Sequence, residues 1–239
     1  MVDRGAGPRA AGPPVAGSAV MIVAIDGPSG SGKSTAARRL AERLGLPVLD
    51  TGAMYRAAAL KVLEAGVDPA DRQAVVEVLE STDIDLRPAP EGALEVMLDG
   101  RPVGERIRIP EVTAATSRIS AYPEVRRRQV ALQRRVAARQ GAVVEGRDIG
   151  TVVFTDTPHK FFLHAKPEVR ADRRYRELRT AGVGVARDRV LEEILERDRR
   201  DSGRQDSPLI CDDSYSVIDT SELSPDEIVE RMALSVSGA

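Results

Sequence analysis

Short, largely apolar runs alternate with longer amphipathic segments along this chain. The runs at residues 22–25, 142–145 and 161–163 are each followed by a polar residue or a glycine. Such runs are typical of parallel strands that are buried on both faces. The segments between them carry apolar residues at helical spacing, with arginine and glutamate on the opposite side. Strands that alternate with helices predict an α/β fold with a parallel central sheet.

Capping residues predict where the helices begin and end. Thr51 is predicted to be the N-cap of one helix, and Gly66 to end it. Ser224 and Glu227 have the spacing of a capping box for the final helix. The other predicted helices cover residues 34–44, which end at Gly45, and residues 70–80, 110–120, 124–140, 168–180 and 187–200. Short strands are also predicted at residues 47–49 and 217–218.

The pattern changes between residues 83 and 107. Residues 83–86 and 94–98 alternate between apolar and polar positions, which favours half-buried strands. Asp99-Gly100 is a typical hairpin turn. We therefore predict a small antiparallel sheet, inserted into an otherwise α/β chain.

Composition and charge narrow the classes of function. The chain has 239 residues, of which 42% are hydrophobic and 30% charged, with a formal net charge of -2. That length fits one domain with insertions or two small domains. The balanced charge argues against general nucleic-acid binding, which needs a basic excess. The lysines are Lys33, Lys61, Lys160 and Lys166, and the other basic residues are arginines, whose planar groups suit phosphate recognition without proving it.

Cysteine usage and the N-terminal segment bear on the compartment. Cys211 is the single cysteine, so an intrachain disulfide is impossible and a reducing compartment is expected. No apolar run approaches the ~20 residues that span a bilayer. Residues 1–20 are rich in glycine, proline and alanine, and we predict a disordered leader rather than a signal peptide. We expect a cytoplasmic protein with no membrane partner.

A phosphate-binding loop follows the first predicted strand. The segment fits the pattern G-x-x-x-x-G-K-[ST], and its context of strand before and helix after is the one that the mechanism requires. Backbone N–H groups and the helix N-terminus would hold the phosphates. Lys33 is expected to reach the β- and γ-phosphates and the Ser34 hydroxyl to bind Mg²⁺. The residues are Gly27, Pro28, Ser29, Gly30, Ser31, Gly32, Lys33 and Ser34. The chain contains no asparagine, so the N-K-x-D element of GTPases is absent.

Three further segments are candidates for binding the acceptor. The turn at residues 50–56 follows the second strand, on the sheet edge where ligands bind in such folds. Its Arg56 could reach an acceptor phosphate or be a solvated surface residue. Arg147 and Asp148, between glycines at the end of another strand, could bind phosphate and sugar or base, could hold water on Mg²⁺, or could form an internal salt bridge. Arg197, Asp201 and Arg204 share one face of a predicted helix. They could belong to a lid that closes over ATP, or they could be a row of solvated surface charges.

These motifs together resemble bacterial-type cytidylate kinases. The resemblance covers about residues 21–234 and rests on four segments. They are the D-G-P-S-G-S-G-K-S loop, the D-T-G-x-x-Y-R turn, the E-G-R-D-I-G-T-V-V-F segment and the E-R-D-x-x-D-x-x-R helix. The resemblance implies ATP and CMP or dCMP as substrates and Mg²⁺ as cofactor. It also implies a P-loop NTPase fold and a monomeric protein. The implied core is residues 21–52, 141–168 and 205–236, with an NMP-binding insertion at about 53–140 and a lid at about 169–204.

The resemblance also implies roles for individual residues. Lys33, Arg147 and Arg197 would act in catalysis, and the phosphate loop would bind ATP together with Thr35. The implied CMP-binding residues are Thr51, Arg56, Ser117, Arg126, Arg147, Asp148, Arg197, Asp201 and Arg204. Thr51 stands where many relatives carry serine, the leader has no family role, and Gly203 predicts a helix end before Arg204.

Two other functions are compatible with a phosphate loop. A kinase that phosphorylates a small-molecule hydroxyl, of the shikimate or gluconate type, would need Asp148 or Asp50 as a general base. The several arginines near the predicted acceptor site argue against it. A nucleotide-gated binding or motor protein would hydrolyse ATP without an acceptor, and the compact insertion and lid argue against that reading.

Overall fold

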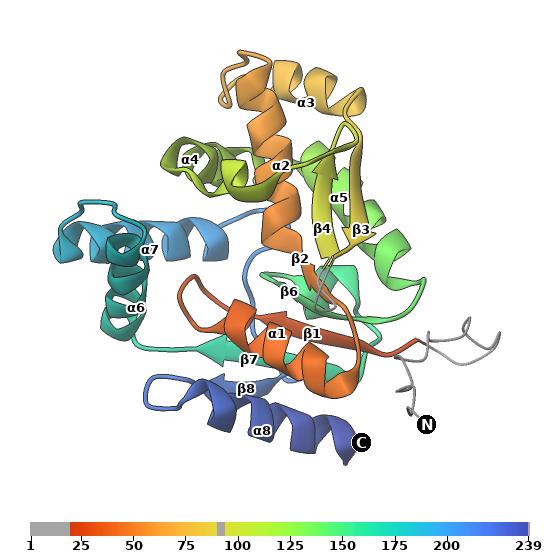
Figure 1. Ribbon diagram of the computed structural model, residues 1–239, viewed down its shortest axis with the longest axis vertical. Helices are drawn as coiled ribbons and strands as arrows, with labels where there is room; N and C mark the ends of the chain where they lie inside the picture. The colour runs from red at the N-terminus through yellow and green to blue at the C-terminus, as the bar shows by residue number, and fades with distance from the viewer. Residues whose placement is uncertain (1–19, 90–93, 239) are drawn as a thin grey trace, which may run out of the picture.

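The computed structural model describes residues 20–89 and 94–238. Within these residues a parallel sheet has the strand order β2-β6-β1-β7-β8, and a smaller antiparallel sheet has the order β3-β4-β5 (Figure 1). The central strands are β1 (Ile22–Asp26), β2 (Val48–Asp50), β6 (Ala142–Gly146), β7 (His159–His164) and β8 (Ser216–Asp219). The smaller sheet contains β3 (Ile84–Pro88), β4 (Leu94–Leu98) and β5 (Arg101–Pro102). The predicted α/β architecture is confirmed, while the predicted leader lies outside the described residues except for Val20.

The helices follow the predicted order. They are α1 (Lys33–Leu44), α2 (Thr51–Glu64), α3 (Arg72–Glu80), α4 (Pro110–Ile119), α5 (Pro123–Ala137), α6 (Pro167–Thr180), α7 (Arg187–Ser202) and α8 (Pro225–Ser237). Two short turns, which the pattern did not predict, are the 3-10 turn η2 (Gly104–Arg108) and the π turn η3 (Ile149–Val153). No helix in the described residues is both long enough and apolar enough to cross a lipid bilayer.

Both faces of the central sheet are buried, which explains the apolar runs. Val23 and Ile25 of β1 pack in a cluster with α1 and α8, whereas Ala24, on the other face, packs in the cluster formed with α2 and α5. Alternate residues of one strand therefore belong to different cores. In Figure 1, α1 lies in front of β1, α8 lies at the bottom of the view, and α2 rises above the strands.

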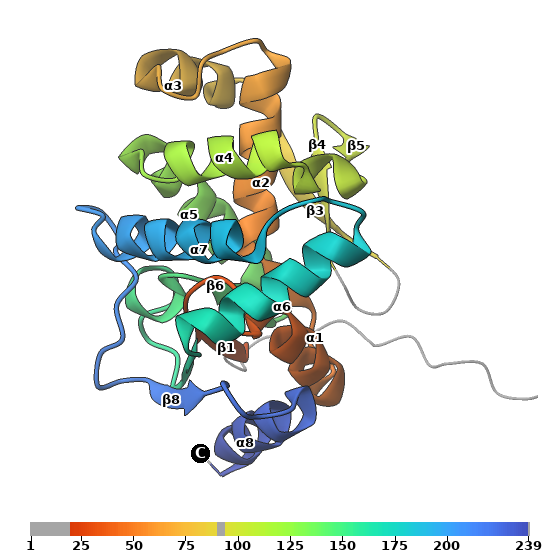
Figure 2. The same cartoon turned by 90° about the vertical axis from the view of Figure 1, so that its left-hand side faces the viewer.

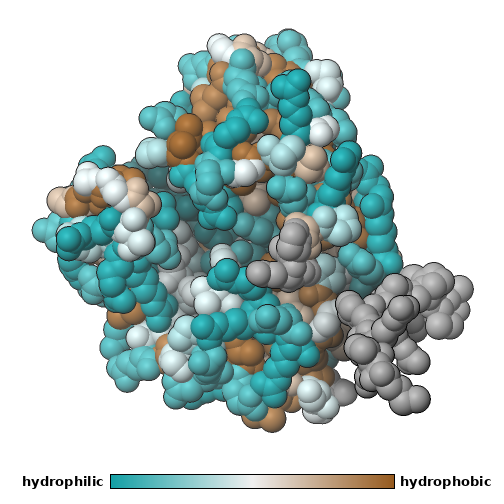
Figure 3. All heavy atoms as spheres, in the orientation of Figure 1, coloured by the Kyte–Doolittle hydropathy of each residue, from teal (hydrophilic) through white to brown (hydrophobic). Residues whose placement is uncertain are grey.

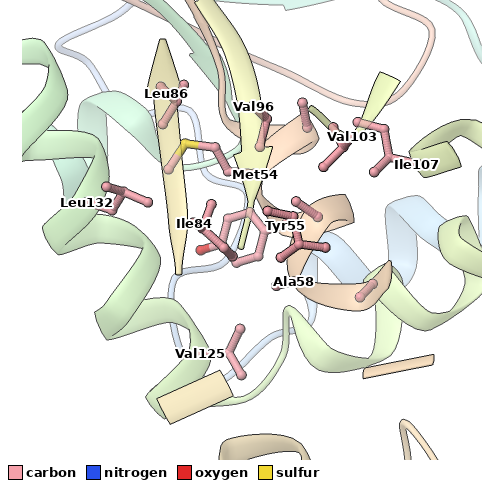
Figure 4. Packing of buried hydrophobic residues seen from close by; sticks show 14 of the residues in the cluster. Met54, Tyr55, Ala58, Ile84, Leu86, Val96, Val103, Ile107, Val125 and Leu132 are labelled. Carbon is pink, nitrogen blue, oxygen red and sulfur yellow. The ribbon is translucent and has the colours of Figure 1, made fainter. Parts of the chain in front are cut away.

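Helix α2 packs on both the central sheet and the smaller antiparallel sheet. Met54, Tyr55 and Ala58 on α2 pack among side chains of β3, β4 and α5, including Ile84 and Leu132 (Figure 4). The cluster continues into the sheet through Ala24 and Val144. The predicted insertion at 53–140 thus shares its hydrophobic cluster with the central sheet, and its boundaries stay a prediction.

The N-cap of α2 differs from the prediction. Asp50, not Thr51, is the cap, and its Oδ1 accepts a 2.8 Å hydrogen bond from the backbone N–H of Ala53. The Thr51 hydroxyl instead donates to the backbone oxygen of Glu145 at 2.7 Å. The helix therefore begins directly where β2 ends, because Thr51 is tied to the neighbouring strand β6.

Other local predictions are confirmed. Asp99 and Gly100 have φ values of 49° and 76°, and they form the turn between β4 and β5. Gly45 ends α1 in the left-handed conformation, and both hydrogen bonds of the Ser224–Glu227 capping box are present.

Helices α6 and α7 form an arginine-rich hairpin with a small core of its own. Ala171, Val190 and Ile194 form that core. Figure 2 shows α7 lying between α6 and α4. Figure 3 shows a recess between this hairpin and the upper part of the molecule, with hydrophilic side chains around it. The hairpin is the segment in which we predicted a lid.

Candidate active site

The phosphate loop connects the end of β1 to the start of α1. Gly27 has a φ of 145°, and a Cβ there would lie 2.0 Å from the backbone oxygen of Leu163, so only glycine fits. Gly32, at the N-cap of α1, has no capping side chain. The first N–H groups of α1 therefore have no intrahelical partner and are available to an anion. Lys33 is 5% exposed and donates a 2.7 Å hydrogen bond to the Pro28 carbonyl.

The charge of Lys33 depends on an anion being present. Burial, together with the nearby Arg147 and Arg197, lowers the pKa of Lys33 to about 7, although Glu145 and Asp26 oppose the shift. A triphosphate next to the amine would favour its charged form and raise that pKa again.

Binding of a nucleoside triphosphate at pH 8 should therefore take up about one proton per site. At that pH the Lys33 amine of the free protein is mostly neutral, because its pKa is about 7. Uptake should fall as the pH drops below 7, where the amine is already charged. Titration calorimetry in buffers of different ionisation enthalpy measures the number of protons. The Lys33→Arg variant is the control, because its side chain stays charged; equal uptake in both proteins would contradict the prediction.

Glu145 is a carboxylate at this edge that the sequence reasoning missed. It is the penultimate residue of β6, the strand next to β1 in the sheet, and is 6% exposed. Burial, with Asp50 nearby, raises its pKa, while Lys33, the Ser34 hydroxyl and Arg147 oppose the shift. The signal available in the sequence was an acidic residue at the end of a predicted buried strand, whereas the place of that strand beside β1 comes from the structure. The Ser34 hydroxyl and Glu145 carboxylate offer the oxygen ligands that Mg²⁺ prefers.

A cluster of three arginines surrounds the carboxylate of Asp201. Arg147 Nε lies 2.9 Å from it and Arg197 Nε 3.8 Å, and Arg204 forms a further ion pair with it. Burial opposes the ionisation of Asp201, but the arginines outweigh burial and lower its pKa. Burial and Arg147 lower the pKa of Arg197 to about 10. As predicted, α7 ends before Arg204, at Ser202 with Gly203 as its C-cap.

Arg126 and Asp148 form a second, more deeply buried ion pair. They are 3% and 5% exposed. The Arg126 guanidinium also donates to the Ser120 carbonyl at 3.2 Å and lies 5.6 Å from the centre of the Tyr55 ring. Asp148 therefore pairs with Arg126 rather than with its neighbour Arg147. Tyr55 is another residue that the sequence reasoning did not assign to the site.

Arg56 lies at the start of α2 and folds back toward the end of β2. Its Nη2 is 3.0 Å from Asp50 Oδ2. Its Nε is buried and has no hydrogen-bond partner within the described residues. A buried donor without a partner is costly, so this group favours the arrival of an acceptor atom.

Ser117 lies on α4. Its hydroxyl accepts a 2.6 Å hydrogen bond from Arg200 of α7. It lines a cavity of about 560 Å³ between α4 and α7. The other lining residues are Ala121, Glu196, Arg199, Arg200, Gly203 and Arg204. The structure thus places Ser117 next to α7, in the predicted lid.

Most of the predicted residues meet at one edge of the central sheet. Strands β2, β6 and β1 are neighbours and parallel, so the turns after Asp50, Gly146 and Asp26 lie side by side. They bring Lys33 of the phosphate loop close to Arg147, and α7 adds Arg197, which lies near both Lys33 and Arg56. This edge can hold several anionic groups at once.

Comparisons with known proteins agree with this arrangement. A family model described as cytidylate kinase matches residues 23–237. A cytidylate kinase of Caldanaerobacter subterraneus subsp. tengcongensis is 48% identical over 210 residues, which cover 88% of this chain and 92% of that protein. A cytidylate kinase of Corynebacterium glutamicum is 49% identical over 213 residues, covering 89% and 92%. The solved structure of an uncharacterized protein from Eubacterium ventriosum aligns with 92% of this chain and 99% of its own, at a TM-score of 0.51 and 14% identity, and this shows likeness of fold alone.

Proposed function

The chain belongs to the cytidylate kinase family of nucleoside monophosphate kinases, and from this premise we propose that it transfers the γ-phosphoryl group of ATP to CMP or dCMP, giving ADP and CDP or dCDP. One observation supports this most directly: a complete phosphate loop shares a sheet edge with guanidinium groups of three other segments. The phosphate loop with Lys33 suits the phosphates of the donor, and the guanidinium groups suit the phosphate of an acceptor.

The acceptor in this reaction is a phosphate oxygen, which is already anionic near neutral pH. No strong general base is required, and catalysis consists of positioning and charge neutralisation. We assign Lys33 to the β- and γ-phosphates, and Arg147 and Arg197 to the transferred group. A kinase acting on a hydroxyl would need Asp50 or Asp148 as a base, but Asp50 caps α2 and Asp148 is paired with Arg126.

We assign the ATP phosphates to the phosphate loop, residues 27–35, including Thr35 at the start of α1. The Ser34 hydroxyl, with Glu145 beside it, would hold Mg²⁺. When bound, Mg²⁺ would neutralise charge on the β- and γ-phosphates. Burial raises the pKa of Glu145, whereas the nearby Lys33 favours its ionised form, and a bound cation would favour that form further.

We assign CMP to the opposite side of the same edge. Arg56 and Arg147 would bind its phosphate, since Arg56 carries a buried unpartnered donor. Arg126 and Asp148 would hold the base, next to the Tyr55 ring. The Asp201 carboxylate, which its arginines hold in place, would accept a hydrogen bond from a pentose hydroxyl. Arg197 and Arg204 would bind the phosphates. Thr51 and Ser117 stay predicted contacts of CMP. The Ser117 hydroxyl would have to give up its hydrogen bond with Arg200 to bind CMP.

Gly52→Ala should weaken CMP binding and leave ATP binding unchanged. A Cβ at Gly52 would lie 3.0 Å from both Arg56 Nη1 and Asp50 Oδ1, so the Arg56 guanidinium must shift. We expect KM for CMP to rise about 3- to 10-fold. Because alanine favours the helix by about 0.5–1 kcal/mol, thermal stability should not fall much. Gly184→Ala, which meets open space, is the control; an unchanged KM for CMP in the Gly52 variant would contradict the assignment of Arg56.

We further propose that the insertion closes over CMP, that the α6–α7 hairpin closes over ATP, and that the protein acts as a cytoplasmic monomer. The free, exposed thiol of Cys211 is compatible with a reducing compartment. The hairpin core of Ala171, Val190 and Ile194 gives this segment the internal packing that a moving unit needs.

A panel of acceptors at one ATP concentration tests the function. CMP, dCMP, UMP, AMP, GMP, dTMP, shikimate and gluconate are each incubated with the protein, and ADP formation is measured by a coupled assay. We expect rapid turnover with CMP and dCMP. Preferential turnover of another acceptor would contradict the proposal, and fast ADP release without any acceptor would indicate the nucleotide-gated alternative.

A further inference from the structure

Asp26 is a fully buried carboxylate at the end of β1, directly before the phosphate loop. It is 0% exposed. Its Oδ1 accepts a 2.9 Å hydrogen bond from the backbone N–H of Ile149, and its Oδ2 accepts one of 2.9 Å from that of Gly150. The hydroxyl of Tyr215 donates a third, of 2.8 Å, to Oδ2. Burial raises the pKa of Asp26 to about 6, and these three hydrogen bonds oppose the shift by stabilising the ionised form.

The two backbone donors belong to the turn that carries Arg147 and Asp148. This turn leaves β6 at Gly146 and continues as η3. Its backbone N–H groups at Ile149 and Gly150 bind Asp26. Its charged side chains form two ion pairs, Arg147 with Asp201 and Asp148 with Arg126. The carboxylate therefore connects the strand of the phosphate loop to the turn that we assigned to the acceptor.

The third donor comes from a distant part of the chain. Tyr215 precedes β8 and is 8% exposed, and its ring meets Phe162 of β7 edge to face at 5.9 Å. A Cβ at Gly150 would lie 2.6 Å from the Tyr215 hydroxyl and 2.9 Å from Lys160 Cδ. Glycine at this position is what allows the hydroxyl to reach Asp26.

We propose that Asp26 is a positioning residue for phosphoryl transfer, whose carboxylate fixes the Arg147–Asp148 turn against the phosphate loop while Tyr215 holds the carboxylate in place. The proposal rests on the function proposed above. In-line transfer requires the donor and acceptor phosphates to be held at a defined separation, and a displacement of about 1 Å can cost about 10²-fold in rate. Asp26 touches neither substrate; it acts through the turn.

The Asp26→Asn variant tests this with almost no change of shape. An amide has one acceptor oxygen and one donor nitrogen, so the nitrogen would face a backbone N–H or the Tyr215 hydroxyl. We expect kcat/KM for CMP to fall about 10²-fold, with both kcat and KM affected, while the Kd for ATP from calorimetry changes less than about two-fold. Tyr215→Phe removes one of three donors and should give a smaller loss of the same kind. It also keeps the proposal testable if the Asn variant does not fold.

Thr157→Val is the matched control. Its hydroxyl donates to the Ile22 carbonyl at 2.5 Å, so it also fastens β1, but at the end away from the loop. A comparable fall in melting temperature with normal kinetics is expected for it. If Asp26→Asn and Tyr215→Phe behave in the same way, with lower stability and normal kcat and KM, Asp26 is only structural and the proposal is overturned.

Hydrogen exchange separates this proposal from the proposed function. In the protein without nucleotide, the Ile149 and Gly150 amides should exchange faster in Asp26→Asn than in the Thr157 control. A wild-type protein that does not phosphorylate CMP would contradict the function and leave this readout in place. Unchanged exchange at both amides would overturn the role of Asp26 in fixing the turn.

Discussion

Replacing Lys33 with alanine should lower kcat by about 10²–10³-fold, the loss typical of removing one preorganised group from developing charge. Lys33 is 5% exposed at the start of α1, and its amine lies within the electrostatic reach of Arg147, Arg197 and Glu145. The charge that develops on the transferred group would lose its nearest cation from the phosphate loop. The remaining arginines would still bind the acceptor, so KM for CMP should change less than kcat.

Lys61→Ala is the matched control for Lys33. Lys61 is on α2 and pairs with Asp99 at 2.5 Å, at the hairpin of the smaller sheet. Surface pairs contribute about 0–1 kcal/mol, so this variant should keep near-normal stability and turnover. Near-normal ADP production by Lys33→Ala in the coupled assay, with the fold intact by circular dichroism, would contradict the assignment of the phosphate loop.

The parts of the fold that the sequence predicted are those in which neighbouring residues decide the structure. The runs that became β1 and β6 were identifiable because both faces of each strand are buried, which leaves a continuous apolar run. The hairpin at Asp99-Gly100 and the capping box at Ser224 depend on residues within a few positions of each other. The motif-based resemblance to cytidylate kinases is likewise confirmed by the family match.

The predictions that were wrong or missing depend on distant contacts. Asp50 and Thr51 can both cap a helix, and the choice is made by the bond from Thr51 to Glu145, 94 residues away. The turn η3 depends on Asp26, 123 residues before Ile149. No periodicity within a segment carries such information, because hydrogen bonds between segments are set by the tertiary fold.

The same division holds for the candidate site. The phosphate loop is contiguous, so its residues could be identified from spacing alone. Arg147 and Asp201 are 54 positions apart, and Arg126 and Asp148 are 22 apart, so the sequence showed the charges without showing the pairs. Glu145 ended a predicted strand and was taken as part of it, and its position beside Lys33 and Ser34 became visible only with the order of the strands.

Arg126→Ala should weaken CMP binding far more than ATP binding and should also destabilise the protein. The Arg126 guanidinium pairs with Asp148 and lies over the Tyr55 ring. Loss of a hydrogen bond to a charged group costs about 1.5–3 kcal/mol, so KM for CMP should rise by about 10–10²-fold. Removal of one partner of a buried ion pair also costs about 3–5 kcal/mol of folding stability, since Asp148 is left buried without its cation.

The double variant Arg126→Ala, Asp148→Asn separates these two effects. Because the buried uncompensated charge is gone, the free energy of unfolding should recover much of the loss seen in the single variant. CMP binding should not recover, because both groups assigned to the base have been changed. If the double variant regained normal CMP binding together with stability, the effect of Arg126 on CMP would be an indirect result of misfolding. If the single variant lost ATP and CMP binding equally, Arg126 would not belong to the acceptor side, and the base would have to be placed elsewhere along the sheet edge.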